Sequence, residues 1–161
     1  MYKRQDRVWG ISTNDESYVL LDQIRKRMSF SETLSAIRKF ATKYPFCSAH
    51  LIEEKANGSA IIDVLQGEIP GICPVLPLGG KEARAHAIEN LWSNGQVLLP
   101  SPEQYAWVNE LVQELLEFPS SLFDDQVDAM TQALSWLRER ALRLRTFTRS
   151  MNNTGNLSCF L

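Results

Sequence analysis

The chain has 161 residues, a length that suits one domain with a sizeable core. Apolar residues make up 44% and charged residues 22%, an ordinary soluble globular balance. No apolar run approaches the roughly 20 residues of a membrane helix, and no signal peptide precedes the first strand pattern, so we expect a cytosolic protein without a membrane partner. The net charge of −2 argues against a protein that coats nucleic acid by bulk charge.

Charge is distributed unevenly along the chain. Residues 1–43 carry nine Lys or Arg against five acids, residues 101–130 carry seven acids and no Lys or Arg, and residues 138–161 carry five Arg and one Glu. An acidic stretch between basic ends fits a cation-binding centre with flanks that touch phosphates. Solvated helix faces would give the same counts, so both interpretations stay open. The three cysteines are widely spaced and indicate reduced thiols, not a zinc site or a disulfide framework.

The N-terminal third is predicted to form a hairpin followed by a helix. Two β-rich runs, at 8–11 and 18–21, flank residues of turn composition. Ser29 and Glu32 then have the spacing of a capping box, in which each side chain hydrogen-bonds the backbone amide of the other. Apolar residues at helical spacing follow, and the helix is expected to end at Tyr44 before a proline.

The rest of the chain alternates strands with helices. Short strands are expected at 49–52, 72–76 and 97–99, and helices at 60–65, 81–92, from about 101, and from 124. The last helix is expected to have one apolar face, formed by Val127, Met130, Leu134, Leu137 and Ala141. This order indicates an α/β domain with a mixed sheet. The helical periodicity is lost from about residue 146. We therefore expect one domain over 1–145 and a mobile tail over 146–161.

Two acidic clusters are candidates for chemistry. Glu53 and Glu54 follow an apolar strand directly, and ligands of open α/β sheets gather beyond the carboxyl ends of strands. Alternation along the strand would point the two side chains to opposite sides, so we expect only one of them to be a ligand. A solvated acid at a strand end would look the same in the sequence.

The second cluster, Asp124, Asp125 and Asp128, opens the last predicted helix. A purely structural interpretation is available here, because Asp124 suits the N-cap and Asp125 the first turn, where the exposed amides favour acids. The functional interpretation is a metal site. Two divalent ions activate a water and neutralise the phosphate during phosphodiester hydrolysis, and Mg or Mn prefers oxygen ligands such as carboxylates.

Three segments in order carry a more specific resemblance. They are LIEEKANGSAIIDVL, PVLPLGGKEARAHAIENLWSNGQVLLP and LLEFPSSLFDDQVDAMTQAL, and the upstream YVLLDQIRKRMSFSETLSAIRKF supports them. Together, over about residues 8–137, the chain resembles the nuclease domain of the phage terminase large subunit. That resemblance implies an RNase H-like mixed sheet flanked by helices. It also implies an Mg- or Mn-dependent endonuclease that uses two divalent ions to cut concatemeric double-stranded DNA during viral genome packaging.

The resemblance also implies roles for individual residues. Glu53 matches the acid at the end of the fourth strand of the fold, and Asp124 and Asp125 match the acidic pair at the start of the last core helix. We expect Glu53 and Asp125 to bind metal directly and Asp124 to be a ligand or a supporting partner. Lys81 matches a basic position that could approach a DNA phosphate, although an exposed lysine needs no function.

The sequence departs from the family pattern at its N-terminus. The family's first central strand carries an essential Asp, whereas only residues 1–7 precede the first strand pattern here, and Asp6 matches the following connection better than the strand. The phosphate-binding loop of the ATPase half is also missing from the sequence. We therefore expect an N-terminally incomplete domain in which activity is in doubt.

The family also implies partners and a location. These are double-stranded DNA, the terminase ATPase domain, the small terminase subunit and the portal protein, in the cytoplasm of a host cell that carries the phage or prophage. An alternative function stays open: a non-catalytic DNA-binding or portal-docking module, whose Arg-rich 138–149 segment contacts DNA or the portal. DNA binding by such a module would fall with salt but not with EDTA.

Overall fold

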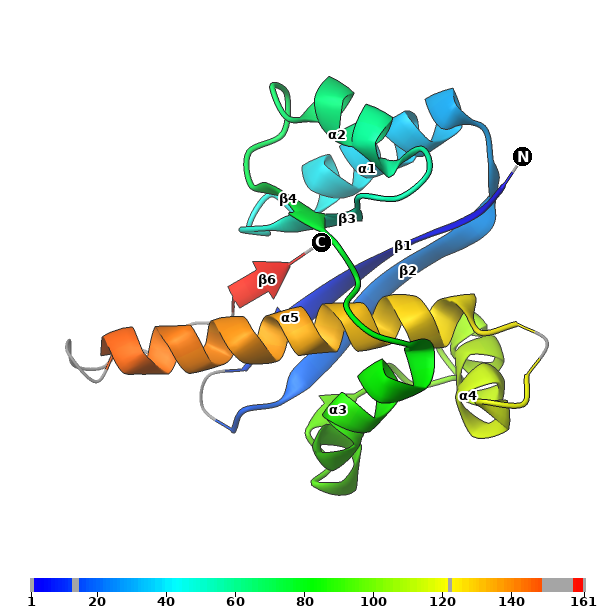
Figure 1. Cartoon of the computed structure of the whole chain (residues 1–161), viewed down its shortest axis with the longest axis vertical. Coiled ribbons are helices and arrows are strands. Elements are labelled where there is room, and N and C mark those ends of the chain that lie inside the picture. Colours follow the sequence, from blue (N-terminus) through cyan, green and yellow to red (C-terminus); the bar gives the residue numbers. More distant parts are fainter. Residues whose placement is uncertain (1, 13–14, 122, 149–157, 161) are drawn as a thin grey trace. The chain divides into compact units, whose positions relative to one another are not determined.

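A computed structural model describes residues 2–12, 15–121, 123–148 and 158–160 (Figure 1). These residues form five helices and strands in two small sheets, which confirms the expected mixed α/β class. The chain divides into two compact units, each described by itself. Unit 1 comprises Met1–Gly10, Leu21–Pro77 and Ser158–Leu161, and unit 2 comprises Ile11–Leu20 and Leu78–Leu157. The expected domain boundary after residue 145 stays a prediction, as does the missing first strand.

The predicted hairpin is present, and its strands are longer than the apolar runs suggested. β1 spans Tyr2–Ile11 and β2 spans Tyr18–Met28. In unit 1, β1 is hydrogen-bonded to β2 on one side and to β6 (Ser158–Phe160) on the other. The two strands continue beyond the apolar runs through polar residues. Among these, the Arg7 Nε donates to the Gln23 Oε1 at 2.5 Å, and both side chains are buried. Hydrogen-bonded polar residues of this kind leave no apolar alternation to detect.

The remainder of unit 1 packs two helices and a small parallel sheet around one apolar cluster. Helix α1 (Phe30–Lys43) begins with the predicted capping box, in which the Ser29 amide donates to Glu32 at 2.7 Å. β3 (His50–Glu53) pairs in parallel with β4 (Ile72–Val75), and α2 (Gly58–Leu65) connects them. The buried cluster consists of Leu34, Ile61, Leu65 and Ile69.

Unit 2 is mainly helical. α3 (Lys81–Ser93) and α4 (Trp107–Glu117) both pack on α5 (Asp125–Thr148), and the short β5 (Val97–Leu98) pairs in parallel with the first residues of β2. Helix α4 begins later than expected, because the amides of Gln104 and Tyr105 both bond the Ser101 carbonyl in a turn before it. The predicted apolar face of α5 is confirmed by four buried residues: Val127, Met130, Leu134 and Leu137.

The C-terminal part of the chain is described only in part. Helix α5 continues to Thr148, and residues 158–160 form β6. The expected mobility of residues 146–161 concerns mainly 149–157 and 161, which lie outside the described residues. Among the helices that the structure describes, none combines the length and the apolar character needed to cross a membrane.

Candidate active site

Glu53 is the last residue of β3, in unit 1. Its backbone is held by the parallel ladder, in which Glu53 lies opposite Val75 and the following Glu54 amide donates to the Val75 carbonyl at 2.9 Å. The side chain is held much more loosely. It is 40% exposed, and Lys55 Nζ lies 3.6 Å from its Oε1. The prediction that this acid ends a strand is therefore confirmed, and its role as a metal ligand stays a prediction.

A glycine packs against the backbone of Glu53. A Cβ atom added at Gly58, the first residue of α2, would lie 1.8 Å from the Glu53 carbonyl oxygen. That distance is far below any van der Waals contact, and the atom it meets is backbone. Only glycine therefore fits where α2 begins beside the end of β3. This close approach explains why a glycine stands at position 58.

The other predicted acids lie at the start of α5, in unit 2. Asp124 precedes the helix, and its carbonyl accepts the first helical hydrogen bond, from the Asp128 amide at 2.9 Å. Asp124 thus occupies the N-cap position, as predicted. Asp125 is exposed, and Asp128 lies one turn further on and is partly buried.

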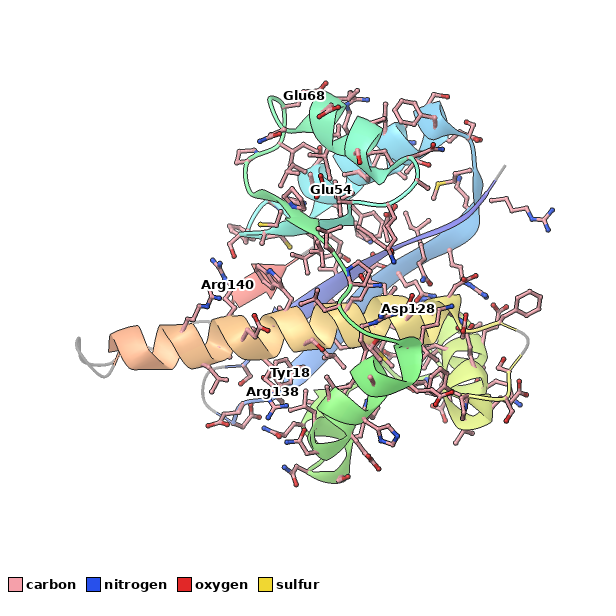
Figure 2. All side chains as sticks on the ribbon, viewed as in Figure 1. Tyr18, Glu54, Glu68, Asp128, Arg138 and Arg140 are labelled. Atoms are coloured by element: carbon pink, nitrogen blue, oxygen red, sulfur yellow. The ribbon has the colours of Figure 1, made fainter. Side chains whose placement is uncertain are left out.

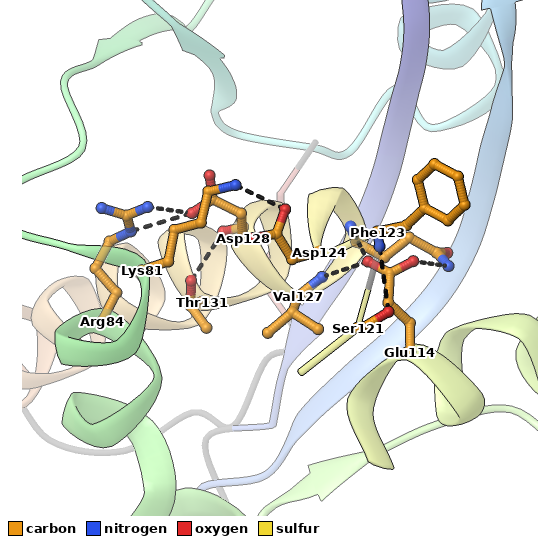
Figure 3. A network of polar contacts seen from close by, with 10 residues as sticks. Lys81, Arg84, Glu114, Ser121, Phe123, Asp124, Val127, Asp128 and Thr131 are labelled. Atoms are coloured by element: carbon orange, nitrogen blue, oxygen red, sulfur yellow. Dashed lines mark hydrogen bonds and ion pairs between the residues drawn. The ribbon is translucent and has the colours of Figure 1, made fainter. Parts of the chain in front are cut away.

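Two basic residues of α3 hold the carboxylates of Asp124 and Asp128 (Figure 3). Lys81 Nζ donates to Asp124 Oδ1 at 2.7 Å. Arg84 donates through its Nε and Nη2 to Asp128 Oδ1, and through its Nη1 to the Gly79 carbonyl at 2.6 Å. This network joins the N-terminal ends of α3 and α5.

The pKa of Lys81 is affected by all three aspartates at the start of α5. The hydrogen bond to Asp124 is the main cause that raises the pKa of the Lys81 ammonium; desolvation opposes it, and the charges of Asp124, Asp128 and Asp125 add smaller increases. The start of α5 therefore stabilises a positive charge at this position. In this structure the partner of Lys81 is a carboxylate of its own chain, and its contact with a DNA phosphate stays a prediction.

Glu114, on α4, is a participant that the sequence did not reveal. It is only 6% exposed. Its Oε1 accepts the amides of Gln126 at 2.5 Å and Val127 at 3.3 Å, and its Oε2 accepts the Gln126 Nε2 at 2.8 Å. A buried carboxylate on the N-terminal amides of a helix is favourable for charge and hydrogen bonding. The one available signal was a glutamate at an apolar position of the α4 stripe, three residues after Leu111.

The donor atoms present fit a hard divalent cation such as Mg or Mn, since all are carboxylate oxygens. Within the described residues, however, no three His, Cys, Asp or Glu side chains lie close enough to hold a metal ion together. Asp124, Asp125 and Asp128 belong to unit 2 and Glu53 to unit 1. Unit 2 therefore brings together Lys81, Arg84 and two of its acids, and the structure leaves the association of Glu53 with them untested.

The fold and these residues define a mixed α/β domain that presents acids at the end of one strand and at the start of a helix. Residues 7–137 match the family described as the terminase RNaseH-like domain. The chain belongs to this family, which implies an RNase H-like fold and a nuclease role in phage DNA packaging. No curated protein and no solved structure gives a significant match.

Proposed function

We propose that this chain is a metal-dependent endonuclease domain that hydrolyses phosphodiester bonds of concatemeric double-stranded DNA during packaging. The observation that carries the proposal is the start of α5, where Asp124 accepts from the Lys81 ammonium at 2.7 Å and Asp128 accepts from Arg84, in a chain of the terminase RNase H-like family. The carboxylate oxygens that pair with these cations are also the donors that a hard divalent ion prefers.

The proposed ligands are Glu53, Asp125 and Asp124, with Asp124 either on the metal or supporting it. Two bound Mg or Mn ions would supply an activated water and neutralise the charge that develops on the phosphate. The protein's own contribution begins before the metal arrives. Lys81 pairs with Asp124 and Arg84 pairs with Asp128, and these two positive charges offset the repulsion between the two carboxylates.

Lys81 would then have a second role. Lys81 lies at the first turn of α3 beside exposed backbone amides, and it would leave the Asp124 carboxylate if that carboxylate held a divalent ion. A lysine and the start of a helix are both suited to a phosphate oxygen. Lys81 would thereby pass from an intrachain ion pair to a contact with DNA. The other expected partners are the terminase ATPase domain, the small terminase subunit and the portal protein.

Calorimetric titration of the chain with Mn²⁺, followed by a plasmid-nicking assay, tests the proposal. Glu53→Gln and Asp125→Asn are expected to lower the Mn²⁺ affinity by about tenfold or more and to abolish cleavage, with unchanged circular dichroism. Asp63→Asn, an exposed acid on α2, is the matched control and should change neither readout.

Two results would contradict the proposal. Normal cleavage by Glu53→Gln or Asp125→Asn would show that the ligand assignment is wrong. DNA binding that persists in EDTA, without Mn²⁺ binding by the chain, would favour the non-catalytic DNA-binding or portal-docking module. Figure 2 labels Arg138 and Arg140 in the Arg-rich segment assigned to that module. Arg138 donates to the Ala87 carbonyl at 2.9 Å and Arg140 lies over the Trp136 ring, so both already have intrachain contacts.

A further inference from the structure

The first amides of α5 are capped by a side chain from another helix, α4. The side chain of an N-cap residue ordinarily accepts the amide of the second or third helical residue, which here are Gln126 and Val127. Both of those amides donate to Glu114 of α4 (Figure 3). Asp124, which holds the N-cap position, directs its carboxylate to Lys81 instead.

We propose that Glu114 is a positioning residue that takes over the capping of α5 and thereby keeps the Asp124 carboxylate available for cation binding. The proposal rests on the proposed function only in so far as the cation is a catalytic metal. Asp124 and Glu114 compete for the same two amides, and only one carboxylate can hold them. While Glu114 does so, Asp124 points toward the cation site.

The surroundings of Glu114 fix this arrangement. Its carboxylate is buried and accepts a third bond, from the Gln126 side chain, so it is constrained from two directions. A buried carboxylate with several donors is strongly favoured in its place, because an unsatisfied buried charge would be costly. Asp124, by contrast, has a side chain that is 33% exposed and one exposed lysine as its partner. Its orientation is therefore the one that changes when Glu114 is removed.

The test compares Glu114→Ala with Glu114→Gln in the full chain. Glutamine keeps an oxygen that can accept the two amides, and the Gln126 amide can turn to match it, so capping persists without the charge. Alanine leaves the amides to Asp124. We expect Glu114→Ala to weaken Mn²⁺ binding by about tenfold, and Glu114→Gln to restore most of that loss. Glu117→Ala, an exposed glutamate on the same helix, is the matched control.

A readout without metal separates positioning from simple stability. The pKa of Lys81 can be followed by NMR of the methylated lysine. It is raised by the hydrogen bond to Asp124 and should fall toward the ordinary lysine value in Glu114→Ala but not in Glu114→Gln. The melting temperature should also reveal the exchange of caps. Asp124→Ala should lower it by less than a degree or two in the wild-type background and by several degrees in Glu114→Ala.

Each outcome decides one of the two proposals. If Glu114→Ala melts earlier but keeps the Lys81 pKa and the Mn²⁺ affinity, Glu114 is only structural and the inference is overturned. If the wild type binds no Mn²⁺, the proposed function fails in this chain, while the Lys81 pKa and the melting temperatures still decide the role of Glu114. Should Glu114→Ala not fold, Glu114→Asp replaces it, because its carboxylate is one methylene short of the amides.

Discussion

The two acid-bearing segments of this chain are held in opposite ways. At Glu53 the backbone is fixed, by the ladder with β4 and by the close approach of Gly58, while the side chain is 40% exposed and has a lysine 3.6 Å away. At the start of α5 the side chains themselves are fixed. Asp124 and Asp128 are each hydrogen-bonded to a basic residue of α3, and Glu114 holds the helix amides.

This difference indicates where each segment is sensitive to substitution. Glu53 is held in place by steric contacts of its backbone, so a change of volume nearby should move it even if no charge changes. The acids of α5 are held in place by polar contacts of their side chains, so a change of hydrogen bonding or charge should move them even if the volume is kept.

Gly58→Ala should have the largest effect. The added Cβ meets the Glu53 carbonyl oxygen at 1.8 Å, and neither backbone segment can yield without breaking the β3–β4 ladder or the first turn of α2. We expect a loss of about 3 kcal/mol in the free energy of unfolding, measured by urea denaturation. Gly67→Ala is the control, because an added Cβ there meets nothing within 4 Å. Equal stability of the two variants would show that sterics do not fix the Glu53 segment.

Gln126→Leu should come next. The substitution keeps nearly the same volume but removes the Nε2 donor of a fully buried side chain, so the buried Glu114 loses one partner. We expect a loss of about 2 kcal/mol, accompanied by faster hydrogen exchange at the first amides of α5. Gln132→Leu, on a partly exposed position of the same helix, should change stability much less. If the two substitutions cost the same, polar contacts do not organise this helix start.

The sequence predicted those features that are encoded locally. The capping box of α1 needs only Ser29 and Glu32, three residues apart, and it was predicted correctly. The apolar face of α5 was predicted because its period repeats within one helix. Glu114 was missed because its partners Gln126 and Val127 lie on another helix, and nothing in the α4 pattern says which amides a buried glutamate will meet.

The same limit applies to the candidate site. Asp124 was correctly placed at the N-cap of α5, but the capping contact itself comes from Glu114 and the Asp124 carboxylate goes to Lys81. Arg84 had no local signal either, since its carboxylate partner is 44 residues away. Residue type and position could thus be predicted from a single segment, whereas the partner of each charge depends on how the helices pack. The roles of Glu53, Asp124, Asp125 and Lys81 stay predictions.

Lys81→Met should have the smallest effect on stability. It should strengthen metal binding, whereas the acid variants should weaken it. The side chains of this ion pair are 45% (Lys81) and 33% (Asp124) exposed, so its loss should change the free energy of unfolding by less than about 1 kcal/mol. The pKa of Lys81 is raised in the folded chain, so the contribution of the pair is present below the unfolded lysine value of about 10.4 and is lost as the pH rises through the folded value. Near neutral pH the wild type should therefore hold a full competing charge at Asp124.

Removal of that charge should favour a metal ion. We expect Lys81→Met to bind Mn²⁺ about fivefold more tightly, because one unit charge a few ångströms away is worth about 1 kcal/mol in water. DNA binding should weaken, and its salt dependence should fall by about one counterion, if Lys81 moves to a phosphate. Lys55→Met is the matched control in the other segment, where the lysine lies 3.6 Å from Glu53, and should alter Mn²⁺ binding less. Weaker Mn²⁺ binding by Lys81→Met would mean that Lys81 supports the acids and does not compete for them.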